Sequence, residues 1–115
     1  MKLLAIDDSN VNLLVMKSII QNHLPDANLS MASSGREGIE RACSEHPDTI
    51  LLDLQMPEMD GYEVIQRLKQ DPVTAYIPII IITAADVASK DRVKALDLGA
   101  DAFLQKPISP HELVA

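Results

Sequence analysis

The amino-acid sequence predicts an α/β fold, a doubly wound sheet of five parallel strands covered by helices on both faces. Five short segments rich in aliphatic and β-branched residues alternate with five segments of helical periodicity. Successive strands begin roughly 20 to 30 residues apart, which is the length of one strand–helix–strand unit. The third strand, residues 50–54, is apolar except for one aspartate, which is typical of a strand buried on both faces.

The first predicted strand covers residues 2–6 and leads into the sequence Asp7-Asp8-Ser9-Asn10. Small polar residues of this kind satisfy the free amides at the start of a helix. A helix over residues 11–24 follows, because its apolar side chains recur at helical spacing until Pro25. The alternation of Leu29 and Met31 with Ser30 and Ala32 then predicts the second strand, over residues 29–32.

A second helix is predicted from Ser34 to about Glu45, because Ser34 and Glu37 have the spacing of a capping box. A third helix, over residues 62–70, follows the loop that ends in Gly61. We expect three aliphatic residues of this helix to face the core: Val64, Ile65 and Leu68.

Residues 77–83 are the most β-prone segment and predict the fourth strand, with Pro78 among its first residues. The fourth helix should end at Gly99 as its C-cap, and the fifth strand should cover residues 102–105. A final helix would begin near Ser109. Little more than one turn remains after that point, so we expect this helix to be truncated.

Length and composition limit the classes of function. A chain of 115 residues suits one domain. The formal net charge of -7 argues against direct binding to nucleic acid or to an anionic membrane. The single cysteine, Cys43, allows no internal disulfide, and we expect it to be a small packing residue. The sequence has no signal peptide and no membrane-length apolar segment, so we expect a cytoplasmic protein.

Acidic and polar residues gather where the predicted strands end. Asp7 and Asp8 follow the first strand, Asp53 ends the third, Thr83 ends the fourth and Lys106 ends the fifth. With the strand order 2-1-3-4-5, the carboxyl ends of the strands meet near the crevice between strands one and three. We therefore expect these side chains to form one site.

The chemistry of this site follows from its charges. Three carboxylates in one place repel each other, and a hard divalent cation with oxygen ligands, Mg²⁺, relieves that repulsion. Lys106 and Thr83 add a cation and a hydroxyl donor for a tetrahedral oxyanion. Asp53 then becomes a nucleophile for phosphoryl transfer.

Each residue also has a simpler interpretation. Asp8 could serve only as a helix N-cap, Thr83 could be an ordinary strand residue, and Lys106 could be a solvated charge. Asp53 could cap the turn that follows its strand. The phosphoryl-transfer site would be absent only if all of these independent interpretations held at once. The presence of all these residues together therefore favours the phosphoryl-transfer site.

These motifs resemble the receiver domains of two-component response regulators along essentially the whole chain. The stretches that carry the resemblance are residues 4–9 (LAIDDS), 51–61 (LLDLQMPEMDG), 80–84 (IIITA) and 99–107 (GADAFLQKP). The resemblance implies a single receiver domain over residues 1–115. It also implies a flavodoxin-like, CheY-like three-layer sandwich with the strand order 2-1-3-4-5.

The resemblance further implies what the acidic residues do. Asp53 would accept a phosphoryl group from a phosphohistidine. Asp8, Asp53 and the backbone carbonyl of Gln55 would bind Mg²⁺, and Asp7 would act on the ion through a water molecule.

Four more positions match residues that hold the phosphoryl group or respond to it in this family. Thr83, the amide of Ala84 and Lys106 would bind the phosphoryl oxygens. Thr83 and Phe103 would be the switch residues, which move on phosphorylation and change the face made by the fourth helix, the fifth strand and the fifth helix.

The partners implied by the resemblance are a sensor histidine kinase or a histidine phosphotransfer protein. The chain would phosphorylate and dephosphorylate only itself, so it would not be an enzyme with a separate substrate. The changing face could form a homodimer, and an output domain could follow on the parent chain.

Three alternative functions stay open. An aspartate-nucleophile phosphatase of the haloacid dehalogenase type needs a second aspartate two residues after Asp53, where this chain has Gln55. A nucleotide or flavin module needs a glycine-rich loop after the first strand, where this chain has Asp7 and Asp8. A degenerate receiver that acts only as a scaffold would normally lack one of the site residues.

Overall fold

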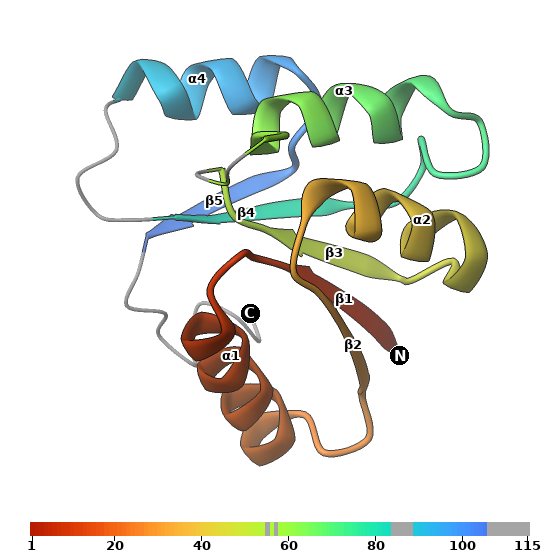
Figure 1. Ribbon diagram of the computed structural model, residues 1–115, viewed down its shortest axis with the longest axis vertical. Coiled ribbons are helices and arrows are strands. Elements are labelled where there is room, and N and C mark those ends of the chain that lie inside the picture. The colour runs from red at the N-terminus through yellow and green to blue at the C-terminus, as the bar shows by residue number, and fades with distance from the viewer. Residues whose placement is uncertain (55, 57, 84–88, 106–115) are drawn as a thin grey trace.

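Five parallel strands form one sheet between two layers of helices in the computed structural model of the chain (Figure 1). The structure describes residues 1–54, 56, 58–83 and 89–105. The strand order β2-β1-β3-β4-β5 confirms the prediction. The strands are β1 (Lys2–Ile6), β2 (Asn28–Ala32), β3 (Thr49–Leu52), β4 (Ile79–Thr83) and β5 (Ala102–Gln105).

The described helices alternate with the strands, as the sequence predicts. They are α1 (Asn10–His23), α2 (Gly35–Glu45), α3 (Gly61–Gln70) and α4 (Ser89–Asp97). Helices α2, α3 and α4 lie on one side of the sheet and α1 lies on the other (Figure 1). The predicted final helix and its truncation fall outside the described residues. None of the helices that the structure describes is long and apolar enough to cross a membrane.

The two faces of the sheet carry separate apolar cores, because successive side chains of a strand point to opposite faces. Ile50 and Leu52 of β3 pack on the side of α2 and α3, while Leu51 packs on the side of α1. All three are at most 3% exposed, which confirms that β3 is buried on both faces. The predicted inward residues of α3 are fully buried: Val64, Ile65 and Leu68.

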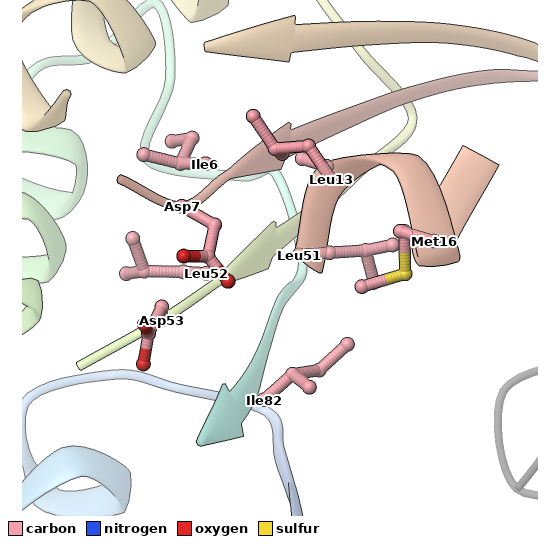
Figure 2. Close-up of a pocket in the computed structure, with 9 residues that line it drawn as sticks. Ile6, Asp7, Leu13, Met16, Leu51, Leu52, Asp53 and Ile82 are labelled. Atoms are coloured by element: carbon pink, nitrogen blue, oxygen red, sulfur yellow. The ribbon is translucent and has the colours of Figure 1, made fainter. Parts of the chain in front are cut away.

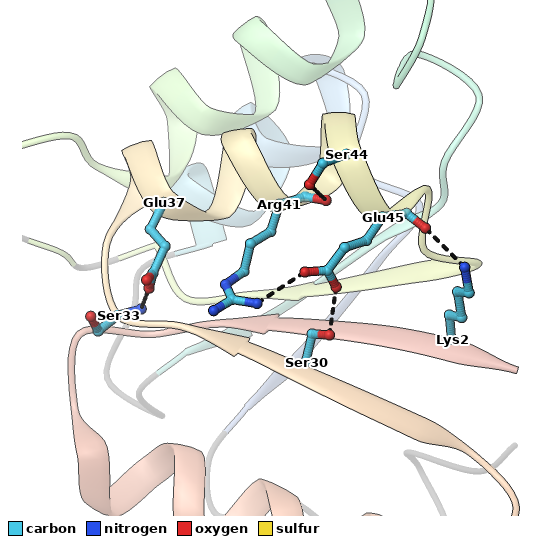
Figure 3. Close-up of polar contacts among 7 residues, drawn as sticks. All are labelled: Lys2, Ser30, Ser33, Glu37, Arg41, Ser44 and Glu45. Atoms are coloured by element: carbon cyan, nitrogen blue, oxygen red, sulfur yellow. Dashed lines mark hydrogen bonds and ion pairs between the residues drawn. The ribbon is translucent and has the colours of Figure 1, made fainter.

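Polar contacts join α2 to β2 and to the segment that precedes the helix (Figure 3). The Ser34 hydroxyl accepts a hydrogen bond from the Glu37 amide, which is one of the two bonds of a capping box. The Glu37 carboxylate accepts from the Ser33 amide at 2.8 Å. At the other end of the helix, the Glu45 carboxylate accepts from the Ser30 hydroxyl of β2 and pairs with Arg41.

The ends of two strands differ from the prediction. β4 begins at Ile79 because the Ile77 amide donates to the Thr74 carbonyl within a turn. β3 ends at Leu52 because the chain turns toward α3, and the Leu54 carbonyl accepts from the Gly61 amide at 2.9 Å. Asp53 therefore lies one residue beyond its strand.

Candidate functional site

Three carboxylates meet at the carboxyl ends of β1 and β3. Ile6 and Leu52 are paired across these two strands, and the Asp53 amide donates to the Ile6 carbonyl at 3.0 Å. Asp7 and Asp53 therefore leave the sheet side by side, and Figure 2 shows both side chains extending into the same region. With Asp8, each offers one oxygen, and these oxygens all lie within 4.8 Å of one another. The structure thus brings together all three predicted acidic residues.

Ser9 fixes the conformation of this corner. The Ser9 amide donates to the Asp7 carboxylate at 2.9 Å, and the Ser9 hydroxyl accepts from the Asn12 amide as the N-cap of α1. Because Ser9 is the cap, the simpler interpretation of Asp8 as a helix N-cap is wrong. Asp8 is exposed and belongs to the acidic cluster.

The burial of the carboxylates suits a hard cation. Asp7 and Asp53 are 7% and 6% exposed, whereas Asp8 is open to solvent. Negative charges this close and this far from water are costly unless positive charge compensates them. The ligands are all oxygen atoms, and the cluster is open to solvent at Asp8. Mg²⁺ prefers oxygen ligands and usually keeps several of its water molecules, so this arrangement suits it. The donor set therefore fits Mg²⁺.

The cavity beside Asp7 and Asp53 is small. It lies between α1 and the sheet, is lined mainly by aliphatic residues, and has a volume of about 10 Å³ (Figure 2). That volume holds about one water molecule. A nucleotide or flavin does not fit in that cavity.

Thr83 supplies a buried donor at the end of the neighbouring strand β4. Its side chain is fully buried, and its hydroxyl has no hydrogen-bond partner among the residues that the structure describes. A buried hydroxyl without a partner costs roughly 1–3 kcal/mol. An oxyanion would accept a hydrogen bond from this hydroxyl. A threonine that served only as a strand residue would not need such an acceptor.

Phe103 lies in the core and is 7% exposed. It belongs to β5, where it pairs with Ile81 of β4. The guanidinium of Arg92 from α4 lies 5.4 Å from the centre of the Phe103 ring. The predicted roles of Gln55, Ala84 and Lys106 concern positions outside the described residues.

Sequence reasoning missed a polar contact between α3 and α4. The Tyr62 hydroxyl, on the first turn of α3, donates to the Asp91 carboxylate of α4 at 2.9 Å. The two residues are 29 positions apart, and no local pattern in the sequence pairs them. Only knowledge that α3 and α4 are neighbours could have identified it.

Several known proteins are similar to this chain in sequence. A family model for the response regulator receiver domain matches residues 3–115. The response regulator PleD of Caulobacter vibrioides is 40% identical over 99% of this chain, which spans 24% of that protein. The alkaline phosphatase synthesis transcriptional regulatory protein PhoP of Bacillus subtilis is 36% identical over 99% of the chain, which spans 45% of it. The chain therefore spans a quarter to a half of these two relatives.

Solved structures show the same fold. A putative response regulator from Chloroflexus aurantiacus superposes with a TM-score of 0.90 at 28% identity, covering 98% of this chain and 90% of that one. The receiver domain of the sensor histidine kinase PA1611 from Pseudomonas aeruginosa gives a TM-score of 0.87 at 26% identity, with the same coverage of both chains. That structure holds a magnesium ion coordinated in its active-site cleft.

Proposed function

The chain belongs to the response regulator receiver domain family of two-component signalling, and we propose that Asp53 is its phosphoacceptor. The observation that carries this proposal is the clustering of Asp7, Asp8 and Asp53 within 4.8 Å at the carboxyl edge of the sheet. Phosphorylation would then change the face through which the chain meets an output domain or a partner.

Asp53 acts as the nucleophile in this proposal. One of its carboxylate oxygens forms a bond to the phosphorus of a phosphohistidine, and the bond between phosphorus and the imidazole nitrogen breaks. The imidazole leaves with the electron pair and takes up a proton from solvent. The hydrogen bond from the Asp53 amide to Ile6 holds the backbone of the nucleophile in place during the transfer.

The acidic neighbours provide a place for the metal. Asp8, Asp53 and the carbonyl of Gln55 would hold Mg²⁺, with Asp7 acting through water, and the family relationship supports this assignment. The chemistry that Mg²⁺ supplies when bound is neutralisation of negative charge on the carboxylates and the incoming phosphoryl oxygens. Asp7, held by the Ser9 amide, keeps the cluster in position.

Further donors would bind the remaining phosphoryl oxygens. The Thr83 hydroxyl is the described candidate, because it is buried and lacks a partner among the described residues. We assign the same role to the Ala84 amide and Lys106 from the family resemblance. Thr83 and Phe103 are the proposed switch residues.

The partners follow from the family. The phosphoryl donor is a sensor histidine kinase or a histidine phosphotransfer protein, and relatives such as PhoP combine a matching segment with further sequence that can hold an output domain. We further propose a cytoplasmic location, self-phosphorylation and self-dephosphorylation rather than turnover of a separate substrate, and homodimerisation through α4, β5 and the final helix. A phosphatase of the haloacid dehalogenase type is disfavoured by Gln55, which cannot act as a general acid.

One experiment tests the proposal. The protein is incubated with Mg²⁺ and acetyl phosphate, and the intact mass is measured for the parent chain and for Asp53→Asn. We expect one added phosphoryl group on the parent and none on the variant. Asp26→Asn, which removes an exposed carboxylate at the turn before β2, is the matched control and should be phosphorylated normally. An unmodified parent chain, or a fully modified Asp53→Asn variant, contradicts the assignment.

A further inference from the structure

Ser9 takes part in the acidic site and in α1 at the same time. Its backbone amide donates to the Asp7 carboxylate at 2.9 Å. Its hydroxyl accepts from the Asn12 amide at 3.3 Å, and its carbonyl accepts from the Leu13 amide at 3.1 Å. One residue therefore orients a carboxylate of the cluster and caps the helix that follows.

The first turn of α1 depends strongly on this cap. The helix begins with Asn10, Val11 and Asn12, and asparagine and valine are weak helix formers. Asn10 and Val11 are exposed, so they bury little apolar surface, and the first buried residue of α1 is Leu13. The bonds that Ser9 accepts are therefore a large part of what holds this turn in helical form.

Loss of the cap would also affect the neighbouring carboxylate. Ser9 has the extended backbone conformation of an N-cap, with φ -93° and ψ 115°. When the first turn frays, this conformation is no longer fixed, and the Ser9 amide loses its direction toward Asp7. Asp7 is 7% exposed and lies within the acidic cluster. Groups that hydrogen-bond to the residues around a metal orient those residues and influence the affinity for the metal.

We infer that Ser9 is a positioning residue for the cation site, because its hydroxyl holds the first turn of α1 in the arrangement in which its amide orients Asp7. This inference rests on the proposed function and adds a residue whose side chain has no role in that function so far. The coupling is reciprocal. If the capped turn favours binding of Mg²⁺, then Mg²⁺ favours the capped turn by the same factor.

The test compares Ser9→Ala with Ser34→Ala. Each variant removes a hydroxyl that caps a helix, since the Ser34 hydroxyl accepts from the Glu37 amide at the start of α2. The Kd of Mg²⁺ is measured from the shifts of backbone amide signals in NMR spectra. We expect about threefold to fivefold weaker binding by Ser9→Ala, which lies within the usual effect of losing an N-cap. Ser34→Ala should bind within about 1.5-fold of the parent chain.

Two further measurements separate positioning from a purely structural role. Ser9→Thr keeps a hydroxyl that can cap the helix, so it should recover most of the Mg²⁺ affinity. In the parent chain, saturating Mg²⁺ should slow hydrogen exchange of the Leu13 amide at least about threefold. The Gly38 amide is the matched control, because it donates to the carbonyl of the other cap, Ser34, and its exchange should not change.

The possible outcomes distinguish the inference from the function on which it rests. An unchanged Kd in Ser9→Ala, or an equal loss of affinity in Ser34→Ala, overturns the inference, because the hydroxyl would then serve only the stability of a helix. Binding by Ser9→Thr as weak as that by Ser9→Ala overturns it too. A parent chain that does not bind Mg²⁺ overturns the proposed function as well, so the two failures are distinct.

Discussion

The Asp53 amide donates a hydrogen bond to the Ile6 carbonyl at 3.0 Å, which joins the proposed nucleophile to the last residue of β1. This bond continues the ladder between β1 and β3 by one residue beyond β3. Asp7 follows Ile6, so its carboxylate is brought beside that of Asp53. The proximity of the two residues thus follows from strand register, and the Ser9 amide then holds the Asp7 carboxylate.

Asp53→Asn should lose most of the stabilisation by Mg²⁺. For the parent chain, a Mg²⁺ concentration roughly 100 times the Kd should raise the free energy of unfolding by about 2.7 kcal/mol. An amide at residue 53 carries no charge, so the variant should gain much less. Urea unfolding with and without Mg²⁺ measures the difference. Asp26→Asn should retain the full increase, and an equal loss in that control would point to nonspecific screening.

Leu68→Ala should destabilise the fold far more than Leu14→Ala. Leu68 is fully buried in the core between α3 and the sheet, whereas Leu14 is 62% exposed on α1. We expect a loss of about 2–5 kcal/mol for Leu68 and a change within about 0.5 kcal/mol for Leu14. Denaturant unfolding compares the two variants. Similar values would mean that the core on the side of α3 is less well packed than described.

Gly61→Ala should be destabilising by about 1–3 kcal/mol, because its new methyl group meets backbone atoms of Asp53 and Leu54 that cannot rotate away. Gly35→Ala is the matched variant, since its methyl group would meet side-chain atoms of Val64 and Met59. Side-chain atoms can shift further than backbone atoms, although the buried Val64 can shift only a little, so Gly35→Ala should cost less. Thermal unfolding of both variants measures the two losses of stability. A larger loss for Gly35→Ala than for Gly61→Ala would contradict the close packing of Gly61 against the backbone.

Ser30→Ala should reduce stability in a pH-dependent way. The hydrogen bond from Ser30, and next the guanidinium of Arg41, lower the pKa of Glu45 below the ordinary value of 4.5 for a glutamate. A lowered pKa in the folded state means that the contribution is present above pH 4.5 and disappears as the pH falls through the folded value. We expect a loss of about 0.5–1 kcal/mol at pH 7 that shrinks below pH 4.5.

The control for this pH dependence is Ser44→Ala. Ser44 is exposed, and its hydroxyl donates to the Arg41 carbonyl and not to a carboxylate. Its small effect should be the same at pH 7 and at pH 3.5, whereas the effect of Ser30→Ala should not. Unfolding by urea at both pH values provides the comparison, and a pH-independent effect of Ser30→Ala contradicts the Glu45 assignment.

Much of the fold could be predicted because each element carries its own pattern. The apolar run of β3 and the spacing of Val64, Ile65 and Leu68 in α3 were sufficient to identify these elements and the sides that they bury. The start of β4 was predicted too early because Ile77 is as β-prone as its neighbours. Its amide is used by a turn, a contact that propensity does not reveal.

The acidic site was predictable for a different reason. Parallel strands place their carboxyl ends at one edge, so Asp7 and Asp53 could be brought together from topology alone. The sequence did not show that the helix cap is Ser9 and not Asp8. The structure makes this assignment and leaves Asp8 for the acidic cluster. The Tyr62 contact with Asp91 depends on the relative position of two helices, which no local pattern encodes.

The pairing of β1 with β3 gives the acidic cluster a property that a loop-built site would lack. Asp7 and Asp53 are distant in sequence, and their carboxylates converge only when two strands from different parts of the chain have formed their ladder. Such non-local contacts are costly in chain entropy and tend to form late in folding. A ligand of both residues would therefore bind only molecules in which β1 and β3 have paired, and would not bind chains in which this ladder has not yet formed.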